Sequence, residues 1–148
     1  MKREIKFRGQ RVGTKEWIYG YYYTDTAFNG FSENKEELWT KSFIRKEKGT
    51  FDGLFLAVEV ITESVGQVTG LLDKNGKEIY EGDVVKDIEF IGTYTITFEL
   101  GCFGLKGNND SLGATGKRNS NFHKMGKFTQ GEKIQIIGNI YENPELIN

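Results

Sequence analysis

The stretch LLDKNGKEIYEGDVV, residues 71–85, sets two turns between short apolar runs and decides the class of fold. Asn75-Gly76 is a pair that a type I′ hairpin turn prefers, because both central residues of that turn need positive φ. Residues 81–83, Glu-Gly-Asp, make a second turn a few residues later. Strands as short as the segments between these turns predict a compact antiparallel β structure.

Further strands are predicted on both sides of this stretch. Apolar residues alternate with charged ones in REIKFRG, and the aromatic run WIYGYYY has β-forming residues on both faces, which favours a place in the core of a sheet. The other predicted strands are residues 54–62, 84–90, 93–100 and 133–142, with a turn at Ile91-Gly92, and residues 99–105 are strand-like. Strands of this length and spacing are typical of a small barrel or sandwich.

One short helix is predicted within this mainly β chain. Ser32 precedes ENKEELW, so that a helix over 32–39 would have an N-cap and acidic residues in its first turn. The following residues, 40–49, fit either a continued helix or a strand.

The composition is that of a globular protein of one domain or two small lobes. The chain has 148 residues, of which 37% are hydrophobic and 28% charged. Its apolar runs are too short to span a membrane, and the charged N-terminal segment lacks the apolar core of a signal peptide. The single cysteine, Cys102, cannot form an internal disulfide. We therefore predict a cytoplasmic protein with no membrane contact.

No catalytic, metal-binding or cofactor-binding constellation can be assembled from the sequence. Counted from Asp73, a calcium loop would need an oxygen ligand at Lys77 and a glutamate at Val84. GATGKR, residues 113–118, lacks the first glycine and the final Ser or Thr of a phosphate-binding loop. Cys102 is expected to be a small buried residue, and it and His123 are too few for a zinc site. The carboxylates between 78 and 89 are expected to form a solvated face. We predict a protein that is not an enzyme and has no cofactor.

A basic segment offers one binding hypothesis. Residues 103–133 carry six basic and two acidic side chains, residues 1–17 do the same, and the segments between and after them are acidic. Lysine and arginine interleaved with phenylalanine can contact phosphates and stack on bases, although a solvated loop would have the same composition. The candidate nucleic-acid-binding residues are Lys106, Lys117, Arg118, Phe122, Lys124 and Lys127.

Four segments together resemble the YopX family of bacteriophage and prophage proteins. They are REIKFRG (3–9), EWIYG (16–20), ESVGQVTGLLDKNGKEIYEGDVV (63–85) and IIGNIYENPEL (136–146). Thr62 stands where the family pattern has proline, and residues 24–57 and 107–132 match nothing in that pattern. The resemblance implies an N-terminal β lobe over residues 1–62 and an SH3-like barrel over 63–148. It implies no catalytic residues.

The resemblance also gives the opening stretch a structural role. Five residues are expected to serve the fold, at positions that need positive φ or close backbone approach: Gly66, Gly70, Asn75, Gly76 and Gly82. Two functions follow as hypotheses. The first is an interaction module that binds a host or phage protein, or itself, through a sheet edge or the aromatic lobe. The second is a nucleic-acid-binding protein that uses the basic 106–133 loop and the basic N-terminus.

Overall fold

A computed structural model describes residues 4–27, 39–45, 57–87, 92–107, 122–125 and 133–147. The predicted mainly β class is confirmed: the described residues form antiparallel strands in two sheets, with two 3₁₀ turns and no α-helix. The strand pairing within the described residues does not close either sheet into a barrel. Most of the predicted 32–39 helix lies outside the described residues, and the ambiguous segment after it is a strand from Trp39.

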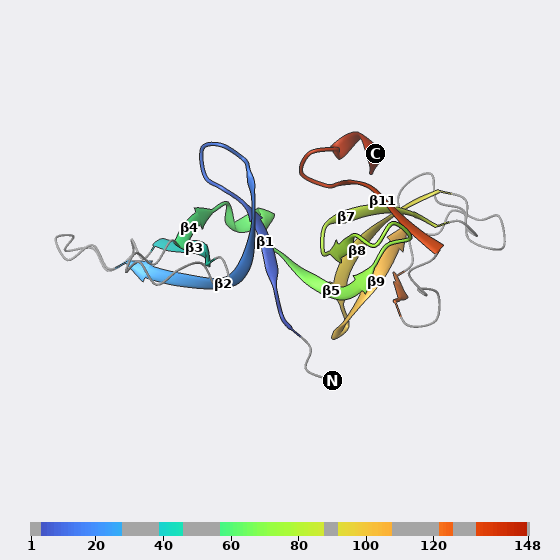
Figure 1. Ribbon diagram of the computed structural model, residues 1–148, viewed down its shortest axis with the longest axis horizontal. Coiled ribbons are helices and arrows are strands. Elements are labelled where there is room, and N and C mark those ends of the chain that lie inside the picture. The colour runs from blue at the N-terminus through green and yellow to red at the C-terminus, as the bar shows by residue number, and fades with distance from the viewer. Residues whose placement is uncertain are drawn as a thin grey trace. The chain divides into compact units, whose positions relative to one another are not determined.

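Eleven strands are described, and they are divided by their contacts between two compact units, Glu4–Gln67 and Val68–Asn148. Figure 1 shows β2, β3 and β4 paired in one unit and β7, β8 and β9 paired in the other. The elements are β1 Phe7–Gln10, β2 Trp17–Ala27, β3 Trp39–Arg45, β4 Ala57–Val60, η1 Thr62–Ser64, β5 Gly66–Leu72, β6 Glu78–Tyr80, β7 Asp83–Asp87, β8 Thr93–Glu99, β9 Cys102–Gly107, β10 Phe122–Lys124, β11 Ile134–Asn139 and η3 Pro144–Leu146.

The N-terminal unit is a curled sheet in the order β4-β3-β2-β1, with the first residues of β5 beside β1. Its apolar core consists of Ile18, Ile44 and Val60, one residue from each of three strands. The residues that follow β1 return to β4, where the Val12 N–H donates to the Glu59 carbonyl and the Ile61 N–H donates to the Gln10 carbonyl. These bonds pair the free edge of β4 with the same chain.

The C-terminal unit contains a five-stranded sheet in the order β10-β9-β8-β7-β11 and the β5–β6 hairpin. Its core is one buried cluster, to which both parts contribute: Ile79, Val85, Tyr94, Ile96, Leu105, Met125 and Ile134. Residues 99–105, strand-like by sequence, are interrupted after Glu99, because Leu100-Gly101 is a two-residue turn between β8 and β9. Both turn residues have positive φ, 53° and 77°, as a type I′ turn requires.

The hairpin turn in the opening stretch differs from the predicted type. Gly76 has a φ of 79°, but Asn75 is not among the described residues with positive φ, so the type I′ prediction is wrong. The Gly76 N–H donates to the Asp73 carbonyl, and the Asp73 N–H donates to the Lys77 carbonyl. This is a type I turn followed by a left-handed glycine. The Asp73 carboxylate causes the difference, because its Oδ1 accepts the N–H groups of Asn75 and Lys77 at 2.8 and 2.9 Å.

Two of the other glycines named from the sequence have positive φ. Gly70, at 83°, lies where the β5–β6 register shifts between Val68 and Leu72. Gly82, at 82°, forms the turn before β7. Gly66 is buried but is not among the described glycines with positive φ, so a need for positive φ does not explain it. No helix in the described part of the chain is long and apolar enough to cross a membrane.

Candidate functional site

Strand β2 presents a row of three tyrosines at the surface. Tyr19, Tyr21 and Tyr23 are 46%, 43% and 44% exposed, whereas Ile18 is buried in the core. Alternate residues of a strand point to opposite faces of the sheet, so the three tyrosines share one face. The expectation that the run WIYGYYY enters the core is therefore correct for one face of β2 and wrong for the other.

Neighbouring strands extend this row into a surface. Tyr23 is paired with Phe43 of β3, and their rings stack with centroids 5.5 Å apart and an interplanar angle of 18°. Trp17, two residues before Tyr19, lies on the same face of β2. We call this surface the aromatic face, defined as Trp17, Tyr19, Tyr21, Tyr23 and Phe43.

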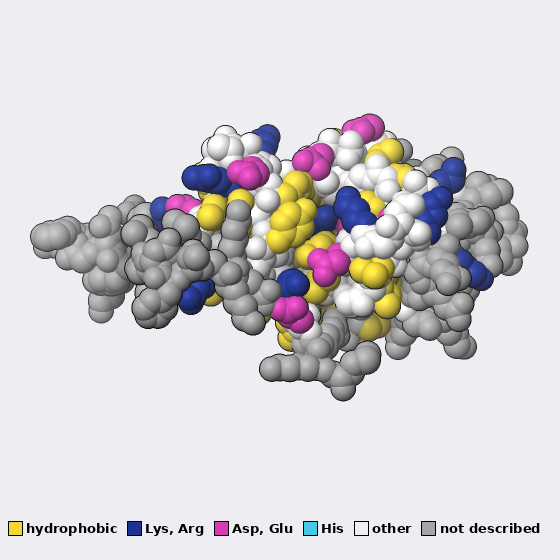
Figure 2. Space-filling model, viewed as in Figure 1, with side chains coloured by type: hydrophobic (Ala, Val, Ile, Leu, Met, Phe, Trp, Pro, Cys, Tyr) yellow, Lys and Arg dark blue, Asp and Glu magenta, His cyan; other side chains and the backbone are white. Residues whose placement is uncertain are grey.

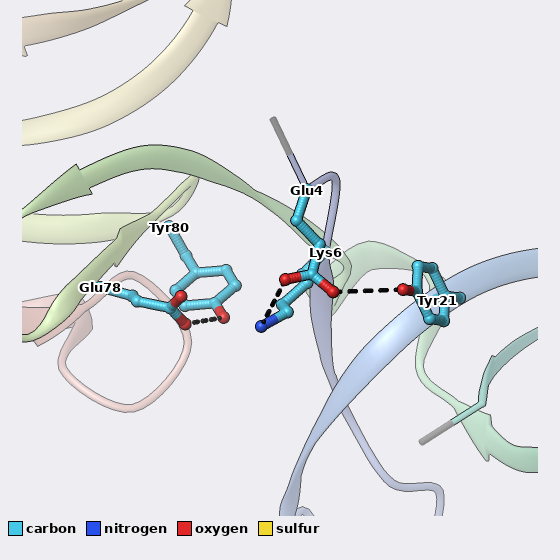
Figure 3. Close-up of polar contacts among 5 residues, drawn as sticks. All are labelled: Glu4, Lys6, Tyr21, Glu78 and Tyr80. Atoms are coloured by element: carbon cyan, nitrogen blue, oxygen red, sulfur yellow. Dashed lines mark hydrogen bonds and ion pairs between the residues drawn. The ribbon is translucent and has the colours of Figure 1, made fainter. Parts of the chain in front are cut away.

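Basic side chains from β1 and the residues before it border the aromatic face, and each has a defined contact. The Arg8 guanidinium lies 4.6 Å from the centroid of the Trp17 ring, a cation–π arrangement, and Arg8 is buried. Figure 3 shows Glu4 between Lys6 and Tyr21: its carboxylate accepts the Tyr21 hydroxyl at 3.2 Å and pairs with Lys6 Nζ at 3.2 Å. The acid thus fixes one tyrosine of the row and balances one lysine.

The far border of the aromatic face is also balanced in charge. Lys41 pairs with Glu59 of β4 at 3.1 Å and is opposite Asp25 in the β2–β3 register. Among the described residues of this face and its borders, four cations (Lys6, Arg8, Lys41 and Arg45) stand beside three acids (Glu4, Asp25 and Glu59), an excess of one positive charge. Figure 2 shows basic, acidic and hydrophobic side chains interspersed among the coloured residues of the view displayed.

Hydroxyl groups, of which those of Ser42 and Ser64 belong to buried residues, hold the opposite side of the same strands in place. The Tyr22 hydroxyl lies 3.2 Å from Ser42 Oγ, which lies 2.9 Å from Thr62 Oγ1. Ser64 Oγ donates to the Ile61 carbonyl at 2.6 Å and accepts the Gln10 N–H at 2.8 Å. Because these bonds join β1, β2, β3 and η1, the strands that carry the aromatic face are fixed relative to one another.

The candidate nucleic-acid-binding residues are described only in part. Lys106 is exposed on β9 and pairs with Glu99 at 3.1 Å. The backbone of Phe122–Lys124 forms β10, in which Phe122 pairs with Lys106 and Lys124 with Gly104. Lys117, Arg118 and Lys127 lie outside the described residues.

The carboxylates of the opening stretch have structural roles. Asp73 is buried, and its Oδ2 accepts the Ile136 N–H at 3.3 Å in addition to the two bonds at Oδ1. Burial raises the pKa of Asp73, but the backbone N–H groups of Lys77, Asn75 and Ile136 outweigh it and leave that pKa below its ordinary value. The expectation of a solvated acidic face is wrong for Asp83, which is buried and accepts the Tyr80 N–H at 2.8 Å. Glu78 accepts the Tyr80 hydroxyl at 2.8 Å (Figure 3).

Cys102 belongs to no metal cluster in the described part of the chain. Within it, no group of three or more His, Cys, Asp or Glu side chains converges. Cys102 is half-buried at the start of β9, with its thiol 3.6 Å from the Glu99 carbonyl. The backbone of His123 lies in β10, beside Leu105 of β9.

These observations define a mainly β protein of two units, with an exposed aromatic face on the N-terminal one. The chain belongs to the YopX family: the family model described as YopX protein matches residues 6–148. It is also similar to a solved structure, protein EF1440 from Enterococcus faecalis, with 22% sequence identity and a TM-score of 0.49 over 99% of this chain and 100% of that one. No curated protein matches the chain.

Proposed function

We propose that this protein is an interaction module encoded by a phage or prophage, and that it binds a partner protein in the host cytoplasm through the aromatic face. The observation that carries the proposal is the exposed row of Tyr19, Tyr21 and Tyr23. Large aromatic side chains on a water-exposed surface present apolar area that a partner can cover. The family resemblance supports the phage or prophage origin and supplies no catalytic residues, which agrees with a binding role.

The residue types of the aromatic face favour a protein partner. Tyrosine, tryptophan and arginine are the residues that most often dominate the binding energy of protein interfaces. Tyrosine suits such a surface because it has a large rigid ring and a polar end that tolerates water before the partner arrives. The aromatic face combines three exposed tyrosines with the Arg8–Trp17 contact at its border.

The charges around the aromatic face argue against a phosphate backbone as the ligand. Nucleic-acid affinity depends largely on cations that neutralise phosphates. Here Lys6 pairs with Glu4, Lys41 pairs with Glu59, and buried Arg8 lies over Trp17. A strand of nucleic acid would have to displace these acids or lie against them, which favours a partner with charges of both signs.

We further infer an SH3-like architecture for the C-terminal unit. The consecutive antiparallel pairing of β7, β8, β9 and β10 and the return of β11 to the side of β7 support it. On this proposal the C-terminal unit is a scaffold, in which the hairpin at residues 71–85 completes the core through Ile79 and Val85.

The test is site-specific photo-crosslinking in the bacterial host. The full chain carries p-benzoylphenylalanine in place of Tyr23, and excess unlabelled chain is added as competitor. We expect a discrete crosslinked protein that wild-type competitor removes. A competitor with Tyr19→Ser, Tyr21→Ser and Tyr23→Ser should not remove it. The matched control is a competitor with Val12→Ser, Leu72→Ser and Ile137→Ser, which alters three exposed apolar residues outside the aromatic face and should compete as wild type does.

Nuclease treatment and direct binding to single-stranded DNA separate the two hypotheses from the sequence. A crosslink that survives nuclease and weak DNA binding at low salt support the protein partner. The alternative hypothesis predicts tight DNA binding whose affinity falls steeply with salt, with a slope of log affinity against log salt of about −0.7 for each phosphate neutralised. The residues that would neutralise phosphates or stack on bases are Lys106, Lys117, Arg118, Phe122, Lys124 and Lys127. Equal competition by the tyrosine variant, or steep salt dependence, would overturn the proposal.

A further inference from the structure

The apolar stripe of the C-terminal core continues past the core to the tip of the β8–β9 hairpin. Along this stripe Ile96 is buried, Phe98 is 49% exposed and Leu100, at the turn, is 86% exposed. Phe98 meets the half-buried Phe103 edge-on, with ring centroids 5.0 Å apart, and Phe103 packs against the core cluster. The tip therefore presents apolar side chains on a rigid, core-anchored base.

The turn residue Leu100 is not one that the turn itself would select. It has a φ of 53° in the left-handed region, where Cβ lies too close to the following carbonyl oxygen and Asn, Asp or Gly is preferred. The next residue, Gly101, follows that preference at a φ of 77°. Leu100 is strained and almost fully exposed, so it stabilises neither the turn nor the core. Backbone strain of this kind points to a role in function rather than in folding.

We propose that the β8–β9 hairpin tip, formed by Phe98, Leu100 and Phe103, inserts into an apolar pocket on another protein. This second interaction site is independent of the aromatic face and is carried by different residues.

The size and charge of the hairpin tip favour an apolar pocket on another protein over a dimer or a lipid surface. Three side chains can bury at most a few hundred Å², far below the roughly 1,200 Å² of a stable interface, so two tips meeting flatly would not hold a dimer. A concave pocket covers the tip from several sides at once and desolvates Leu100 fully. At the base of the tip, Glu99 pairs with Lys106 at 3.1 Å. These two opposite charges suit a polar pocket rim better than a lipid surface, where basic residues alone would be expected.

The decisive variant is Leu100→Asn, with Lys15→Asn as its matched control. Lys15 is the other described non-glycine residue with positive φ, at 58°, and it is also exposed. Asparagine tolerates this conformation, so each variant should melt at the wild-type temperature or about 2–4 °C above it. The variants differ in chemistry, since only Leu100→Asn removes an apolar side chain.

Binding is read by photo-crosslinking in host cells from p-benzoylphenylalanine at position 98, with unlabelled full chain as competitor. We expect a discrete crosslinked protein for which Leu100→Asn competes at least about tenfold more weakly than wild type, the equivalent of 1.4 kcal/mol, while Lys15→Asn competes equally. Binding to vesicles of phosphatidylglycerol and phosphatidylcholine tests whether the hairpin tip binds a lipid surface. Sedimentation velocity of the chain alone tests whether the hairpin tip forms a dimer. The proposal would be overturned if vesicle binding or a dimer of the chain depended on Leu100. It would also be overturned by equal competition from Leu100→Asn, by the absence of a crosslinked protein, or by a lower melting temperature of Leu100→Asn.

Discussion

Asp73 and Ile136 are 63 residues apart in the chain, yet the Ile136 N–H donates to Asp73 Oδ2 at 3.3 Å. The neighbouring Lys74 N–H donates to the Ile134 carbonyl at 2.8 Å. The β5–β6 turn is thereby joined to β11, on whose inner side Ile134 enters the core. One buried carboxylate thus shapes its own turn and holds the last strand of the unit beside it.

The first prediction concerns the charge of Asp73. Because its pKa is lower in the folded chain than in the unfolded one, the folded state binds fewer protons, and its contribution to stability is complete above the unfolded pKa. That contribution is lost as the pH falls through the folded pKa. Urea unfolding between about pH 6 and pH 2.5 should show wild type losing stability toward acid.

Asp73→Asn isolates this effect. At neutral pH it should lower the free energy of unfolding by about 1.5–3 kcal/mol, because hydrogen bonds from backbone N–H groups to a charged acceptor are replaced by weaker ones. The gap between wild type and variant should narrow toward acid. Glu145→Gln, at an exposed carboxylate of the same unit, should change stability by less than about 0.5 kcal/mol. A gap that is constant with pH would mean that Asp73 acts through shape alone.

The second prediction separates backbone strain from steric contact at two glycines. Gly76 and Gly82 have nearly the same φ, 79° and 82°. A Cβ at Gly76 would meet nothing within 4 Å, whereas one at Gly82 would lie 3.1 Å from Tyr141 Cε2. The Gly82 N–H and carbonyl are also bonded to Ile96 and Ile140, each at 2.9 Å, so the backbone there is held on both sides.

We therefore expect alanine to be more damaging at Gly82. Gly76→Ala should cost about 1 kcal/mol of unfolding free energy from the left-handed conformation alone. Gly82→Ala should cost roughly 2–3 kcal/mol, since the same strain is joined by overpacking against Tyr141. Chemical denaturation of both variants provides the measurement. Equal losses would show that the Tyr141 ring moves aside without cost.

The third prediction concerns the hydroxyl that joins η1 to β1. Ser64 is buried, and its Oγ is the acceptor for the Gln10 N–H at 2.8 Å. Ser64→Ala should lower the free energy of unfolding by about 1–3 kcal/mol, because this acceptor is lost from a buried site. In Thr14→Ala the lost bond is an exposed one, in which the Glu16 N–H donates to Thr14 Oγ1 at 3.4 Å. Its loss should lower the free energy of unfolding by no more than about 0.5 kcal/mol. If the two variants lost the same stability in thermal melts, water would be replacing the Ser64 hydroxyl.

Local signals in the sequence account for the class of fold and for most turn positions. Gly70, Gly76 and Gly82 have the positive φ that their places between apolar runs suggested. The turn type at residues 73–77 could not be predicted in the same way, because it depends on where the Asp73 side chain finds its donors. The Leu100-Gly101 turn was missed because leucine carries no turn signal.

The candidate site was harder to predict than the fold. In WIYGYYY both alternating sets are apolar or aromatic, so the period of two gave no sign of which set faces the core. Only the pairing with β1 and β3 places Ile18 and Tyr22 inside and the other tyrosines outside. The polar hydroxyl of tyrosine was the signal available, and it distinguishes Tyr19 from Ile18 but not from Tyr22.

The last prediction concerns IIGNIYENPEL, one of the segments that carry the family resemblance. Gly138 is not among the described glycines with positive φ, so any side chain could adopt its backbone conformation. Its role is close approach: a Cβ there would lie 2.5 Å from Asn143 Oδ1 and 2.8 Å from Leu146 Cδ1. Room is needed because Asn143 Oδ1 accepts the Asn139 N–H at 3.4 Å as the chain turns back on β11.

A double-mutant cycle tests this close approach. Gly138→Ala should lower the free energy of unfolding by roughly 2–3 kcal/mol through overpacking, and Asn143→Ala by about 1 kcal/mol through the lost hydrogen bond. Removing the Asn143 amide also removes two of the three nearest atoms that the new Cβ would meet. The double variant should therefore be about 1 kcal/mol more stable than the sum of the single losses predicts. If the losses of unfolding free energy of the single variants were strictly additive in urea unfolding, the reason for glycine at position 138 would be the contact with Leu146 or a shift of η3 as a whole.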